Sequence, residues 1–190
     1  ANRGVLVDQV AFGLQLPDVS VGRLANGQWG LTAPTIGAAN APAPVGSPAS
    51  LKINEWLALG QSLLLDDFIE VFYPHPPPVP IGGMSLTDRP FGGPRRNVIS
   101  PLSFIPGSAY QVFVADGDSG DGHVNFQLSA EGGEIGLFSA GGILVDHVVY
   151  GLQKAGISQG RSPNGSNRIV SLNLPTPGVG NPAPAEPVPP

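Results

Sequence analysis

The chain has 190 residues, of which 41% are hydrophobic and 12% charged, and its 27 glycines and 22 prolines predict many turns, loops and linkers. It contains no cysteine, which excludes disulfides, thiolate metal sites and cysteine nucleophiles. A net charge of −5 gives no electrostatic footprint for nucleic acid, and the apolar runs are too short to span a membrane.

The first element in chain order belongs to an internal repeat. Residues 4–27 (GVLVDQVAFGLQLPDVSVGRLANG) align without a gap to residues 142–165 (GILVDHVVYGLQKAGISQGRSPNG), and about half of the positions are identical. After a shift of three residues, the P-T-x-G and Asn positions that follow also match, so residues 4–40 duplicate residues 142–181. The chain therefore divides into a partial repeat (1–40), a Pro/Ala linker (41–50), a complete domain (51–181) and a Pro-rich tail (182–190).

The complete domain has the pattern of short strands. Residues 51–56 predict a strand, followed by a loop over residues 57–65. Further along, Pro74–Pro80 predicts a stiff polyproline-like excursion, either a rigid loop or a docking ligand. Alternating apolar and polar residues, separated by Gly-containing breaks, predict strands at Asp67–Tyr73, Ala109–Ala115, Asn125–Ser129, Ile135–Phe138 and Ile143–Tyr150. Many short strands with regular turn signals are typical of an all-β sandwich or barrel.

The carboxylates and serines form no recognisable catalytic set. Glu55 and Glu70 lie in predicted strands, and we expect them on outward faces rather than paired as acid and base. The serines lie in no nucleophile elbow, and no Gly-rich phosphate loop follows a strand and opens a helix. We therefore expect no enzymatic activity.

An acidic turn, Asp116–Gly122 (DGDSGDG), is the candidate metal site. Its carboxylates, Asp116, Asp118 and Asp121, are of the type that binds a hard cation such as Ca²⁺. The spacing is not that of an EF-hand, because the twelfth position is Gln127 rather than a bidentate Glu. The alternative is a solvated turn in which Asp and Gly supply turn conformations.

An S-x-G-R segment occurs in both repeats and predicts a structural turn with an ion pair. Asn-Gly favours a tight turn, and glycine permits close approach of another backbone. Arg161 is expected to pair with an inward carboxylate, and Asp146 is the candidate because it also recurs, as Asp8. Ligand recognition by Arg161 is the alternative. The predicted structural set is Asp146, Ser158, Gly160, Arg161, Asn164 and Gly165.

Four motifs occur in a fixed order along residues 51–181. They are I-N-E at Ile53–Glu55, D-F-I-E-V-F-Y at Asp67–Tyr73, S-x-G-R-x-P-N-G at Ser158–Gly165 and T-P-G-x-x-N at Thr176–Asn181. This series resembles the bacterial branch of the lamin tail domain family. The chain departs from the family pattern at Phe68, where the family has Trp, and at the proline-rich excursion, which replaces an Asn-x-Gly turn. The resemblance implies an immunoglobulin-like β-sandwich in a large extracellular protein, with a role in attachment rather than catalysis.

The partial repeat is surplus, because one sandwich has one position for its last strands. It is either the end of a preceding unit in a tandem array, or a segment that pairs with an exposed edge on a neighbour through Val5, Val7, Val10 and Phe12. We expect a non-catalytic structural or adhesive module, extracellular or on a bacterial cell surface, that needs no cofactor. Its partner would be another copy, a tandem neighbour or a different surface protein. The alternative is an accessory domain of a secreted enzyme that binds a polymer or Ca²⁺.

Overall fold

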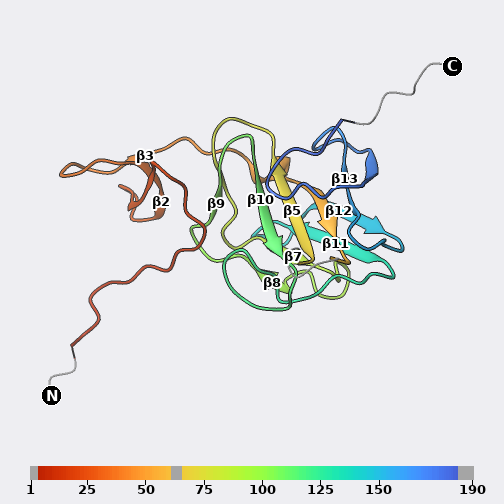
Figure 1. Cartoon of the computed structure of the whole chain (residues 1–190). Helices are drawn as coiled ribbons and strands as arrows, with labels where there is room; N and C mark the ends of the chain where they lie inside the picture. Colours follow the sequence, from red (N-terminus) through yellow and green to blue (C-terminus); the bar gives the residue numbers. More distant parts are fainter. Residues whose placement is uncertain (1–3, 61–65, 184–190) are drawn as a thin grey trace.

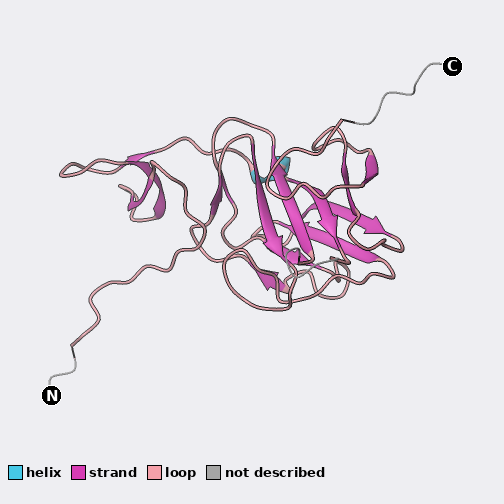
Figure 2. Cartoon of the chain, viewed as in Figure 1, coloured by secondary structure: helices cyan, strands magenta, loops and turns pink. Residues whose placement is uncertain are grey.

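The computed structural model describes residues 4–60 and 66–183, and in this part the protein is all-β (Figure 1, Figure 2). A β-sandwich-like body with two main antiparallel sheets follows an N-terminal part that has a small sheet of its own. The single helical element among the described residues is the short 3-10 helix Pro48–Ser50. The described helical structure offers no segment long and apolar enough to cross a membrane.

The first main sheet of the body has five strands in the order β10-β5-β4-β13-β14, and all neighbours run antiparallel. Its strands are β4 (Lys52–Leu57), β5 (Phe68–Tyr73), β10 (Ala109–Val114), β13 (Ser158–Arg161) and β14 (Ile169–Leu172). The three strands β4, β5 and β10 are rich in β-branched and aromatic residues, which pack well on a pleated surface. Strands from both ends of the domain thus lie side by side, because β13 pairs with β4.

The second main sheet has the order β12-β11-β7-β8, and a separate two-stranded ribbon pairs β6 with β9. The strands are β7 (Ser85–Thr87), β8 (Asn97–Val98), β11 (Gly133–Phe138) and β12 (Leu144–Tyr150), and the ribbon joins β6 (Val79–Pro80) to β9 (Phe104–Ile105). The proline-rich excursion therefore ends in a paired strand, with Val79 fully buried.

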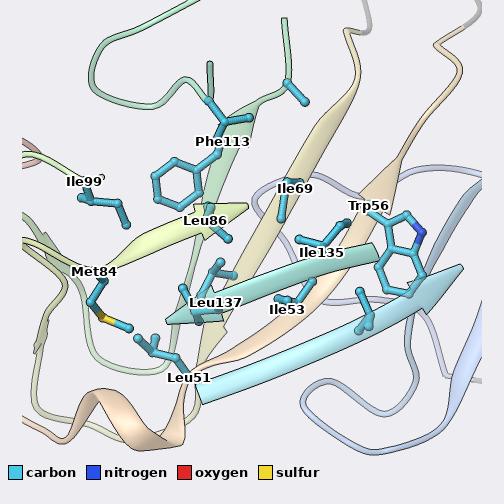
Figure 3. Close-up of a cluster of buried hydrophobic side chains, with 14 of the residues drawn as sticks. Leu51, Ile53, Trp56, Ile69, Met84, Leu86, Ile99, Phe113, Ile135 and Leu137 are labelled. Carbon is cyan, nitrogen blue, oxygen red and sulfur yellow. The ribbon is translucent and has the colours of Figure 1, made fainter. Parts of the chain in front are cut away.

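Apolar side chains of the two main sheets form one core (Figure 3). The fully or nearly fully buried members include Ile53, Trp56, Ile69 and Phe113 from the first sheet and Leu86, Ile135 and Leu137 from the second. Burying one such side chain contributes about 1.5–3 kcal/mol. The core therefore fixes one face of β4 and β5, and the opposite face of these strands is available for other contacts.

The N-terminal part forms a small antiparallel sheet in the order β1-β2-β3. Its strands are β1 (Ser20–Arg23), β2 (Trp29–Ala33) and β3 (Ala41–Pro42). In Figure 1 the sheet that contains β2 and β3 lies to one side of the sandwich body. Residues 4–19 contain no strand, and β3 takes the first residues of the stretch that the sequence assigned to a linker.

The predicted strands at residues 51–56, 67–73, 109–115, 135–138 and 143–150 are confirmed as β4, β5, β10, β11 and β12, with bounds shifted by at most two residues. The predicted strand Asn125–Ser129 is wrong. Phe126 and Leu128 are buried, but the segment makes only an isolated bridge, between Gln127 and Asp116. Its alternation reflects side chains that enter the core from a turn. The predicted loop over residues 57–65 lies partly outside the described residues, as does most of the predicted tail, 182–190.

Candidate assembly interface

Three polar residues of β4 and β5 lie on the face away from the core, and the structure buries all of them. Asn54, Glu55 and Glu70 are each 0% exposed. The expectation that the two glutamates face solvent is therefore wrong. The reason is that the C-terminal repeat, residues 142–181, covers this face and supplies the hydrogen-bond donors that buried carboxylates require.

Glu55 is held by two residues of the C-terminal repeat. Ser158 donates its hydroxyl to Glu55 Oε1 at 2.5 Å. Thr176 donates its backbone N–H to Oε1 at 3.0 Å and its hydroxyl to Oε2 at 2.9 Å. Hydrogen bonds to a charged acceptor are among the stronger ones in proteins. The carboxylate thus ties β4 to both β13 and the loop that follows β14.

Glu70 is the second buried carboxylate, and it has fewer donors. Gly178 donates its N–H to Oε2 at 2.7 Å, and Asn54 donates its side-chain amide to Oε1 at 2.9 Å. Burial raises the pKa of Glu70 to about 7; these hydrogen bonds lower it, and the neighbouring charge of Glu55 raises it further. Glu70 is therefore the group of this face whose charge changes near neutral pH.

Side-chain amides form further hydrogen bonds between β4 and the C-terminal repeat. Asn54 accepts from the N–H of Gly165 at 3.0 Å and donates to Asn164 Oδ1 at 3.1 Å. Asn181 donates both to the carbonyl of Asn54, at 3.1 Å, and to the carbonyl of Arg161, at 2.9 Å. An amide that bridges two backbones in this way fixes the separation of β4 and β13.

A buried ion pair spans the same junction. Arg161 Nη2 lies 2.9 Å from Asp146 Oδ2, with side chains only 5% and 8% exposed. The pair also holds β4, because Ile53 donates its N–H to Asp146 at 2.8 Å and accepts from Arg161 Nε at 2.8 Å. Lys52 lies 3.3 Å from the same carboxylate. The structure thus gives the predicted Arg161–Asp146 pair a structural role.

Gly160 lies where β13 meets β4 most closely. A Cβ atom built at this position would lie 2.8 Å from the carbonyl oxygen of Asn54 and 2.5 Å from Asn181 Nδ2. A real Cβ does not approach a backbone atom so closely. The glycine of the S-x-G-R segment is thus required by the close contact of the two strands.

The N-terminal repeat makes the same contacts within itself. Arg23 Nη2 lies 2.8 Å from Asp8 Oδ2, and Asn40 donates to the carbonyl of Arg23 at 3.0 Å. Thr35 Oγ1 lies 3.3 Å from Asn40 Oδ1, and Thr176 Oγ1 lies 3.0 Å from Asn181 Oδ1. The β1-β2 hairpin thus resembles the β13-β14 hairpin in its ion pair and asparagine bridge, while its turn is shorter, residues 24–28 against 162–168.

The N-terminal repeat differs from the C-terminal one in what lies against it. β13 pairs with β14 on one side and with β4 on the other, whereas β1 pairs with β2 alone within residues 4–60 and 66–183. Its ion pair is open to solvent, with Arg23 46% and Asp8 63% exposed. Within the described residues, the N-terminal repeat therefore has no strand in the place that β4 takes beside the C-terminal repeat.

The four predicted strand-pairing residues lie on an exposed segment. Val5, Val7, Val10 and Phe12 are 88%, 95%, 39% and 61% exposed. They align with Ile143, Val145, Val148 and Tyr150, of which Val148 and Tyr150 are buried and Ile143 is 72% exposed. The counterparts of Val10 and Phe12 thus enter the core, whereas the counterpart of Val5 does not.

The N-terminal repeat contacts the sandwich body through the segment before β1. Gly13 donates its N–H to the carbonyl of Pro101 at 2.9 Å, and Phe104 donates to the carbonyl of Leu14, also at 2.9 Å. The Leu14 N–H donates to Ser103 Oγ at 3.0 Å, and its side chain packs against the core. This contact anchors the segment before β1 and leaves the β1-β2 hairpin away from the body.

The acidic turn does not gather its carboxylates. Asp116 Oδ2 lies 2.7 Å from His123 Nδ1, and Asp116 Oδ1 accepts from the N–H of Asp118 at 3.0 Å. Some desolvation raises the pKa of Asp116, but these two hydrogen bonds outweigh it and lower the pKa. Within the described part of the chain, no group of three or more His, Cys, Asp or Glu residues, Asp121 included, has the geometry of a metal site.

Sequence reasoning missed Asn54, Glu55, Glu70, Thr176 and Asn181 as members of the junction. The signal that identifies Thr176 and Asn181 is the repeat, since the threonine and the asparagine are identical in both copies. Searches with family models, curated proteins and solved structures found no match to the chain.

Proposed function

We propose that this chain is a non-catalytic structural module of an extracellular or cell-surface protein, with a lamin-tail-like, immunoglobulin-like sandwich. It assembles with a neighbouring unit through its N-terminal repeat. The observation that supports this proposal is the half-built junction: the N-terminal repeat has the hairpin, ion pair and asparagine bridge of the C-terminal repeat, and its β1 edge has no β4 against it within the described residues.

Two physical properties of the N-terminal repeat, its strand edge and its exposed apolar residues, favour assembly with a neighbouring unit. An unpaired strand edge presents backbone donors and acceptors that pair readily with another strand. Val10 and Phe12 add exposed apolar surface at positions whose counterparts are buried. In the repeat arrangement, one unit's edge meets the next unit's strand, so the contact is head-to-tail and builds an array rather than a closed dimer.

The mass of the purified chain in solution, measured by light scattering over a concentration series, tests the proposal. We expect assemblies that grow with concentration, and a monomer for a chain that lacks residues 1–40. Because that deletion also removes the anchor at Leu14, a double substitution, Val10→Asp with Phe12→Asp, is the matched variant in the whole chain. A monomer of the unaltered chain at every concentration would contradict self-assembly.

A further inference from the structure

We infer that the N-terminal repeat receives a β4-type strand, an extended segment with Asn-Glu at its centre, from a neighbouring unit. The inference rests on the proposed function and names the partner of the same surface. In the C-terminal repeat, β4 presents this dipeptide as Asn54 and Glu55, with Ile53 before it.

The residues whose side chains or close backbone contacts meet β4 or Glu70 are all identical in the two repeats. A position that faces another element can differ, since His147, which hydrogen-bonds Glu134 of β11, aligns with Gln9. The residues that meet β4 or its neighbour Glu70 are Asp146, Ser158, Gly160, Arg161, Asn164, Gly165, Thr176, Gly178 and Asn181. Their counterparts are the same residue types: Asp8, Ser20, Gly22, Arg23, Asn26, Gly27, Thr35, Gly37 and Asn40.

The donors for a glutamate are present in the N-terminal repeat. Ser20 and Thr35 align with Ser158 and Thr176, which donate three hydrogen bonds to Glu55. In the structure the Ser20 hydroxyl shares a hydrogen bond of 2.8 Å with Thr32, and Thr35 donates to Asn40. These are local contacts on a part-buried or exposed surface, so an incoming carboxylate, a stronger acceptor, would replace them.

The surface also selects for Asn-Glu rather than for any strand. Asn54 both donates to and accepts from the C-terminal repeat, which an acidic or apolar residue cannot do. Glycine at position 22 leaves room for the carbonyl that precedes the glutamate, as Gly160 does for Asn54. In a second copy β4 pairs with its own β13, so a neighbouring copy supplies this strand by giving up that pairing and accepting the N-terminal hairpin in its place.

A fluorescein-labelled peptide of residues 51–58 (LKINEWLA) tests the inference by fluorescence anisotropy with the whole chain. We expect saturable binding, and about tenfold weaker binding of the matched peptide with Glu55→Ala, because a carboxylate with three donors is lost. A chain with Ser20→Ala and Thr35→Val should bind the first peptide about tenfold more weakly and discriminate little between the two peptides.

The control chain carries Ser119→Ala, at an exposed serine of the acidic turn outside both repeats, and it should bind both peptides as the unaltered chain does. The inference is overturned by an absence of saturable binding, by equal affinity for the two peptides, or by an equal effect of the control substitution. Peptide binding by a chain that stays monomeric supports this inference and contradicts self-assembly, so the two proposals fail separately.

Discussion

The Arg23–Asp8 pair of the N-terminal repeat and the Arg161–Asp146 pair of the C-terminal repeat join equivalent atoms at 2.8 and 2.9 Å. The first pair is about half exposed, whereas the second is almost completely buried under β4. The same sequence motif therefore gives a solvated ion pair in one place and a desolvated one in the other. The neighbouring strand, and not the motif, decides the energetic weight of these residues.

The largest expected effect separates the two ion pairs. Arg161→Ala leaves Asp146 buried with Lys52 as its remaining basic partner, and should lower the free energy of unfolding of the sandwich by about 3 kcal/mol. Arg23→Ala removes an exposed pair and should cost less than about 1 kcal/mol. Urea unfolding, followed by far-ultraviolet circular dichroism, measures both, since Arg23 lies against Trp29 and its removal would alter the fluorescence directly. Similar losses for both variants would contradict the comparison.

Much of the fold was predictable from local pattern, and the junction was not. Alternation places β5 and β10, because one face of each strand meets the core. Local pattern does not show what covers the face of a strand opposite the core. The burial of Glu55 and Glu70 depends on residues more than a hundred positions away in sequence. Alternation at Asn125–Ser129 correctly predicted which side chains are buried. It wrongly predicted that the segment pairs as a strand, because pairing also depends on residues outside the local pattern.

The repeat holds the long-range information that local pattern lacks. The residues identical in both copies include some that, in the C-terminal copy, contact a strand outside the repeat, as Thr176 and Asn181 do. The identity of the two copies at these positions is therefore a sequence signal for Thr176 and Asn181 as junction residues. It does not indicate Glu70, because neither copy contains the strand on which it lies.

The second prediction concerns the pH dependence of stability, and it applies only to the C-terminal junction, where Gly178 contacts Glu70. Because the pKa of Glu70 rises from 4.5 to about 7 on folding, the folded protein binds this proton more tightly than the unfolded chain. Its contribution to stability is present below pH 4.5 and is lost as the pH rises through 7, a change on the order of 3 kcal/mol.

Glu70→Gln removes this titration, so the free energy of unfolding should lose its decline across that pH window. The slope of the free energy of unfolding against pH is the quantity to compare, because glutamine also replaces one of the two acceptor oxygens and so changes the stability at every pH. Glu131→Gln, at an exposed carboxylate, is the control and should leave the decline in place. An unchanged slope in the Glu70 variant would show that another group causes the decline.

The smallest stability effect comes from the paired glycines. Gly160→Ala places a Cβ 2.8 Å from the Asn54 carbonyl, which must shift β4, at a cost of about 1–3 kcal/mol. At Gly22→Ala the three nearest atoms all belong to the exposed Asn40 side chain, which can move at the cost of its hydrogen bond to the carbonyl of Arg23, so the loss should stay within about 1 kcal/mol.

Peptide binding reverses the order of the two glycine variants. The Cβ added at position 22 occupies the space that the incoming Asn carbonyl needs, so Gly22→Ala should abolish saturable binding of the LKINEWLA peptide. A substitution that costs little folding stability but abolishes binding indicates that the surface binds a partner. Unchanged peptide affinity in this variant would place the partner strand somewhere other than the edge of β1.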